Sequence, residues 1–261
     1  MEENCPSLLH LYTSPLLYIT YICLLKKKAM KQRYSILIPF LILGSMFFFG
    51  CRSTQPQEKP NHLFAEFFVR YLQAEQELKA HASFYEGDTI KTAVPKSFAG
   101  GATFQGQSME ARNLPGGTIR YIYEQLGSYA DTFQFSFKDD FGQSRGIPVA
   151  MTPIDSFAVQ GGQASRSTGM GLYARGGQLS RGESMVLLFS DENQKASTIL
   201  LTGPSAGEAY RIPAAKVETL SPGKNTLYLV KKKRTVEKGD SLSILADIEF
   251  YTRTIEVEIV E

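Results

Sequence analysis

The chain has 261 residues, with 28 Lys and Arg against 26 Asp and Glu and a formal net charge of +2. Five of the basic residues and two of the acidic residues precede residue 51, so the rest of the chain is close to neutral and its bulk charge gives no support to nucleic acid as a partner. No cysteine follows Cys51, which excludes a disulfide framework and a thiolate metal site beyond that point.

The first fifty residues have the parts of a secretory signal peptide. Lys31 and Arg33 precede an unbroken apolar run at residues 34–49, and Gly50 follows as the small residue at the cleavage point. A second apolar stretch, residues 8–25, lies upstream, so two segments could form a membrane hairpin. We expect instead that Met30 is the true start and that the residues before it are a mis-called extension, because the chain from Met30 is a complete signal peptide.

Cys51 comes directly after Gly50, and the chain turns polar at once. The segment from Met30 to Cys51 resembles the lipobox of bacterial lipoproteins, although Phe48 and Phe49 stand where that family prefers a branched aliphatic residue and a small one. The resemblance implies cleavage before Cys51, acylation of its thiol, and membrane lipid as a partner. Residues 1–50 would be the signal segment and 51–60 a lipidated tether. The alternative is an uncleaved transmembrane helix, but sixteen apolar residues fall short of the ~20 that span a bilayer.

Period-two alternation dominates the rest of the chain. Phe133, Phe135 and Phe137 alternate with polar residues, as in a half-buried strand with Phe135 in the core, and similar runs recur between Gly, Pro and Asp turns. The sequence therefore predicts an all-β fold of two tandem immunoglobulin-like sandwiches, one at 61–160 and one at 161–261, the second opening with a glycine-rich junction.

Residues 63–78 fit two patterns. Phe64, Phe67, Phe68 and Tyr71 form a helical stripe, yet Phe67, Val69 and Tyr71 also alternate in period two. We favour two strands joined near residues 74–76, because the neighbouring segments are all of the β type.

Few residues suit catalysis. Beyond Cys51 the histidines are His62, next to the tether, and His81, which we expect on a solvated strand face. Histidine-based nucleophilic systems and His-rich zinc sites therefore lack members. Asp139 and Asp140 could bind calcium or hydrolyse a glycoside, but their neighbours predict a turn, as do those of Asp191. We expect no catalytic residue, no metal and no cofactor.

The strongest charge feature is the run Lys231, Lys232, Lys233 and Arg234. It could hold an anionic ligand, or it could discourage edge-to-edge pairing of a strand, which we favour. A regular strand would send Lys231 and Lys233 to one face and the other two to the opposite face, so a common binding patch would need a bulge.

The chain as a whole resembles the uncharacterised envelope lipoproteins of Bacteroidota-type bacteria. That resemblance implies a lipid-anchored protein of the outer membrane, and we expect the periplasmic face rather than the cell surface. The function that we expect is a non-catalytic binding or assembly module with an envelope protein or a glycan as partner. The alternatives are glycan binding for a polysaccharide-uptake system and, more distantly, a carboxylate-dependent hydrolase.

Overall fold

The computed structural model describes residues 62–261. They are predominantly β-strand and include a single short α-helix, α1 (Ala214–Val217), which confirms the all-β prediction. No helix in this part of the chain is long and apolar enough to cross a membrane. The predicted signal segment at 1–50, the tether at 51–60 and the acylation site Cys51 lie outside the described residues.

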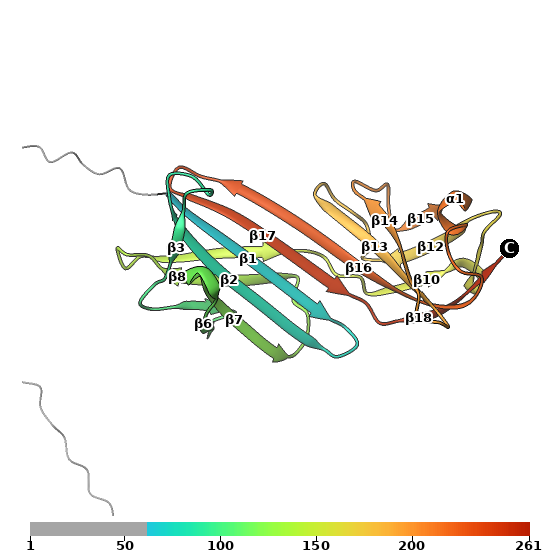
Figure 1. The fold of residues 1–261 in the computed structure, drawn as a ribbon, viewed down its shortest axis with the longest axis horizontal. Coiled ribbons are helices and arrows are strands. Elements are labelled where there is room, and N and C mark those ends of the chain that lie inside the picture. Colours follow the sequence, from blue (N-terminus) through green and yellow to red (C-terminus); the bar gives the residue numbers. More distant parts are fainter. Residues whose placement is uncertain (1–61) are drawn as a thin grey trace, which may run out of the picture. The chain divides into compact units, whose positions relative to one another are not determined.

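The largest sheet has eleven strands (Figure 1). Its main path runs in the order β11, β18, β16, β17, β1, β2, β7 and β6, and β3, β13 and β14 pair beside it. The strands are β1 (His62–Leu72), β2 (Glu77–Gly87), β3 (Val94–Lys96), β6 (Glu110–Asn113), β7 (Ile119–Leu126), β11 (Gln163–Ser165), β13 (Glu183–Asp191), β14 (Ala196–Thr202), β16 (Gly223–Lys238), β17 (Leu242–Tyr251) and β18 (Ile255–Val260).

Two smaller sheets complete the fold. A four-stranded sheet has the order β5, β4, β8, β9, and a three-stranded sheet has the order β10, β12, β15. Their strands are β4 (Ala102–Phe104), β5 (Gln107–Ser108), β8 (Thr132–Lys138), β9 (Ser144–Ala150), β10 (Ser156–Val159), β12 (Met170–Arg175) and β15 (Ala209–Ile212), and short 3-10 turns lie at Pro115–Gly117 and Gln160–Gly162.

The four-stranded sheet packs face to face on the large sheet through aromatic side chains. Phe135 of β8 is 1% exposed, and its ring centroid lies 4.6 Å from that of Phe67 on β1 and 4.8 Å from that of Phe104 on β4. Phe133 and Phe137 are buried on the same side of β8, as the alternation predicted. These contacts form the core between the four-stranded sheet and the large sheet.

The ambiguous segment after residue 62 forms two strands, as favoured. β1 and β2 pair antiparallel, with Phe67 opposite Ala82, and residues 73–76 form the turn between them. The helical alternative is wrong because Phe67, Val69 and Tyr71 face the core together, which only a period-two backbone allows.

Strand pairing crosses the domain boundary expected at residues 160 and 161. β1, in the first half of the chain, pairs in parallel with β17, in the second half, from Leu63 opposite Leu242 to Leu72 opposite Tyr251. The sixteen-residue strand β16 pairs with β18 and β13 over its first part and with β17 over its second part. A linear division at this point would separate paired strands. Local alternation locates strands, but it does not encode which distant strands pair.

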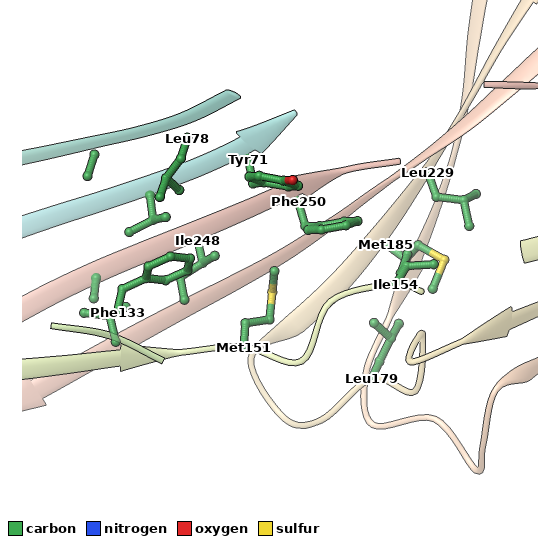
Figure 2. Close-up of a cluster of buried hydrophobic side chains, with 14 of the residues drawn as sticks. Tyr71, Leu78, Phe133, Met151, Ile154, Leu179, Met185, Leu229, Ile248 and Phe250 are labelled. Atoms are coloured by element: carbon green, nitrogen blue, oxygen red, sulfur yellow. The ribbon is translucent and has the colours of Figure 1, made fainter. Parts of the chain in front are cut away.

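The buried side chains form one cluster across this boundary. Figure 2 shows Phe133 at the left, Met151 and Phe250 in the middle, and Ile154, Met185 and Leu179 to the right. Met151 and Ile154 belong to the segment that joins β9 to β10, so the linker itself is part of the core.

Replacement of Phe135 with alanine should lower the free energy of unfolding by about 3–5 kcal/mol, the usual range for a buried phenylalanine. Urea denaturation followed by circular dichroism measures the change. Phe141→Ala is the matched control, because Phe141 is exposed on the β8–β9 turn and its truncation should change the stability by less than about 0.5 kcal/mol. Equal effects of the two variants would contradict the core position of Phe135.

Candidate functional site

Lys231, the first residue of the basic run, is buried rather than available to a ligand. Its side chain is 1% exposed, and Nζ donates hydrogen bonds of 3.0 Å to the backbone carbonyls of Thr152, Gly176 and Gln178. An ammonium group has three protons, so these three acceptors use all of them. Glu183 provides the opposite charge, with Oε2 3.5 Å from Nζ.

This buried cation connects three segments of the chain. Thr152 lies between β9 and β10, Gly176 and Gln178 lie between β12 and β13, and Lys231 itself is in the middle of β16. Gly176 has a φ of +75°, and a Cβ added there would lie 2.1 Å from the carbonyl oxygen of Pro153, so only glycine allows this close approach. Burial lowers the pKa of Lys231 from its ordinary value, while the charge of Glu183 acts in the opposite direction.

The other three basic residues also have partners within the chain. Lys233 Nζ donates to the carbonyl of Ala150 at 2.6 Å, Lys232 Nζ lies 2.9 Å from Glu249 Oε1, and Arg234 binds both carboxylate oxygens of Asp247. Lys231 and Lys233 thus point to one face of β16, and Lys232 and Arg234 to the other, as strand geometry predicts.

The alternative of one anionic-ligand patch formed by all four cations is therefore not supported, because their side chains lie on two faces and have partners within the chain. The edge-protection interpretation is wrong as well, because β16 is paired on both sides at this point, with β13 up to Lys233 and with β17 from Val230 onward. An edge strand has one side without a hydrogen-bonded neighbour, whereas β16 has a neighbour on each side at Lys231, Lys232 and Lys233.

The acidic pairs are turn residues, as predicted. Asp139 Oδ1 accepts the backbone N–H groups of Phe141 and Gln143, and Arg145 donates to its other oxygen. Asp140 is paired with Lys96. The Asp191 carboxylate caps the β13–β14 turn by accepting the N–H groups of Asn193 and Lys195.

The best candidate for a binding site is the outer face of the large sheet, on the side away from the four-stranded sheet. Strand register places its side chains in rows that run across β16, β17, β1, β2 and β7. One row alternates in charge over most of its length, and its members are Lys232, Glu249, Arg70, Lys79 and Glu124. The next row holds Arg234, Asp247, Phe68, His81 and Ile122. We call this surface the open face.

The charged row is linked by ion pairs. Glu249 accepts bonds from Arg70 at 2.9 Å and from Lys232 at 2.9 Å, and Tyr251 donates its hydroxyl to the same carboxylate at 3.0 Å. Burial acts to raise the pKa of Glu249, but these three bonds outweigh it and leave the pKa below its ordinary value. The carboxylate is therefore ionised and fixed in position at neutral pH.

Two hollows adjoin on the open face and share Phe68 and Asp247. One has a volume of about 290 Å³ and extends toward His81, Ser83 and Arg120. The other, of about 340 Å³, extends toward Lys232 and Ser184. The two hollows together place the Phe68 ring between acidic and basic side chains.

Aromatic and guanidinium groups pack on one another along this surface. The Phe68 centroid lies 5.7 Å from that of His81, and the Arg70 guanidinium lies 5.2 Å from the Phe68 ring and 5.4 Å from the Tyr251 ring. Burial lowers the pKa of His81, and the charges of Arg120 and Arg70 lower it further, so its ring is neutral at pH 7. His81 lies outward on a strand as predicted, but against Phe68 rather than in open solvent.

Sequence reasoning missed this site because its residues come from strands nearly 180 positions apart. The outward-facing residues of β1 could be identified from the sequence, because they alternate with its core residues in one period-two pattern. No signal indicated that β17 would lie beside it in parallel.

The groups on this surface are suited to binding a ligand. Within residues 62–261 no group of three or more His, Cys, Asp or Glu could hold a metal ion. Phe68 provides a hydrophobic ring, while Asp247 and Arg120 provide an acceptor and a donor at its sides. Such a combination fits a ligand with both apolar faces and hydroxyl or amide groups.

Substitution of Lys231 by methionine should lower the free energy of unfolding by about 3–5 kcal/mol, because Glu183 would remain buried without its counter-charge. The double variant with Glu183→Gln should recover part of that loss. Lys232→Met, one residue along on the wet face, is the control and should cost about 1 kcal/mol or less. Urea denaturation measures all three. A Lys231→Met protein as stable as the Lys232→Met protein would contradict the structural role of the buried ammonium.

Comparison with known proteins found no protein-family model and no curated protein that matches the chain. The interpretation of the site therefore depends on its own geometry.

Proposed function

We propose that this protein is a lipid-anchored, non-catalytic binding module of the bacterial cell envelope. The segment from Met30 to Cys51 supports the anchor, and the open face with its two adjoining hollows supports the binding role. The proposed location is the periplasmic face of the outer membrane. The proposed ligand is a protein or a glycan.

The finer description of the fold is also a proposal. Each half of the chain has a strand that pairs in parallel with a strand from the last twenty residues: β1 with β17, and β11 with β18. This correspondence supports two immunoglobulin-like sandwiches of similar plan, whose closing strands both come from the C-terminal segment.

The observation that carries the binding role is the position of Phe68. The ring is half-buried between the two hollows, on a surface where a hydrophobic side chain has no part in the core. Asp247 is held beside it by two bonds from Arg234. A ring with pre-positioned polar groups favours a ligand over simple solvation, because less conformational entropy is lost when the ligand binds.

Among ligands, this arrangement favours a glycan. The C–H face of a sugar ring packs on an aromatic side chain, and its hydroxyl groups bond to carboxylates and guanidinium groups. Phe68 and Tyr251 provide the rings, and Asp247, Glu249 and Arg70 provide the polar groups. The hydrolase alternative has no such support, because Asp139 and Asp140 lie in the β8–β9 turn, whose shape Asp139 fixes by accepting the N–H groups of Phe141 and Gln143.

Cys51→Ser should abolish incorporation of labelled palmitate and leave the precursor uncleaved. Labelling of cells followed by electrophoresis measures both. Absence of label from the wild-type protein would overturn the lipid anchor. Protease treatment of intact cells then determines the membrane face: protection of the protein is expected, and digestion would place it on the cell surface.

Phe68→Ala should weaken binding to the glycan that the wild-type protein selects from an array of bacterial envelope polysaccharides. An aromatic contact of about 0.5–1.5 kcal/mol corresponds to a loss of roughly 2- to 12-fold in affinity. Tyr173→Ala is the control, because Tyr173 is an exposed aromatic residue on β12, away from the open face. Retention of full affinity by Phe68→Ala, or selection of no glycan by the wild-type protein, would overturn glycan binding at this surface.

A further inference from the structure

We propose that one end of the first sandwich rests on a lipid bilayer, with Phe141, Ile90 and Val94 in the interface between headgroups and acyl chains. This end is formed by the β8–β9 turn, the loop between β2 and β3, and the start of β1, and we call it the membrane end. The proposal rests on the proposed acylation of Cys51, which would keep this end of the molecule close to the bilayer. It concerns a different part of the molecule from the anchor itself.

Phe141 is the most exposed large hydrophobic side chain among the described residues, at 84%. It is at the tip of a turn whose shape is fixed, because Asp139 Oδ1 accepts the N–H groups of Phe141 at 3.1 Å and of Gln143 at 2.9 Å. The ring therefore projects from a rigid turn rather than from a flexible loop. An aromatic ring at such a tip is costly in water and suited to an apolar environment.

A second loop adds two apolar side chains at the same end. Ile90 is 52% exposed and Val94 is 62% exposed, on either side of the loop that leads into β3. Lys96 on β3 connects this loop to the turn, because its Nζ bonds to Asp140 at 2.5 Å and to Glu86 at 3.0 Å. The two apolar tips are thus held next to each other.

The charge at this end is compatible with a membrane. Asp139 is paired with Arg145, and Asp140 and Glu86 share Lys96. Lys91 and Lys138 are exposed on the same two segments, and so is Asp88. Opposite charges therefore nearly balance at this end, and its apolar side chains carry the contact with the bilayer.

The start of the described chain identifies a bilayer as the occupant. Leu63, the second described residue, lines a hollow of about 110 Å³ together with Phe141, Asp139 and Leu242. Residues 52–61 separate this point from Cys51, and a chain of that length reaches at most ~40 Å. An acylated Cys51 would therefore hold the membrane end close to the bilayer, and tethering makes even a small apolar surface effective by raising its local concentration.

The test uses tryptophan fluorescence, because the chain contains no tryptophan. Phe141→Trp would be made in the full chain, expressed in a bacterium that processes lipoproteins, and the purified protein would be placed in vesicles of phosphatidylethanolamine and phosphatidylglycerol. We expect a blue-shifted emission that brominated lipids quench, most strongly when the bromine atoms are near the headgroups. Tyr173→Trp, on the second sandwich and 52% exposed, is the control and should be neither shifted nor quenched.

Emission from Phe141→Trp that is unchanged by brominated lipids would overturn the proposal. A blue shift without quenching would also overturn it, because the ring would then be covered by protein rather than lipid. The mass of the N-terminal peptide from the same preparation shows independently whether Cys51 is acylated. If it is not acylated, the anchor fails. Quenching after addition of the vesicles would then still support the membrane end, and absence of quenching would refute it.

Discussion

The fold depends on the buried ammonium group of Lys231. It lies in the middle of β16, the longest strand of residues 62–261, where β16 passes from pairing with β13 to pairing with β17. Its three protons are bonded to carbonyls of two segments, the one that joins β9 to β10 and the one that joins β12 to β13, and Glu183 balances the charge. A desolvated cation is tolerated only where all its bonds are made, so the segments at 152 and at 176–178 must keep their positions relative to β16.

The same strand relates the interior of the molecule to the proposed binding surface. Successive side chains of β16 point to opposite faces, so the strand that buries Lys231 also presents Lys232 and Arg234 on the open face. Both are paired there with carboxylates of β17, which in turn border Phe68 on β1. Alternation along β16 thus fixes both the core contact and the charges around the hollows.

Local patterns predicted much of the fold and little of the site. Alternation located β8 and the β1–β2 pair, and turn residues located Asp139 and Asp191, because these structures are determined by neighbouring residues. The pairing of β1 with β17 is determined by contacts between distant segments, and it accounts for both the unforeseen strand pairing across residue 160 and the missed open face. Burial of Lys231 could not be inferred from four consecutive basic residues, since the carbonyls that bind it come from segments more than fifty positions away.

We expect β16 and its buried lysine to make residues 62–261 one cooperative unit. Native-state hydrogen exchange of a variant in the C-terminal half of the chain tests this most directly. Leu172→Ala on β12, where Leu172 is buried, should lower the free energy of opening equally for the slowest amides of β12 and for those of β8 in the first sandwich. If the β8 amides kept their wild-type protection while those of β12 lost theirs, the two sandwiches would be separate units and the account would be contradicted.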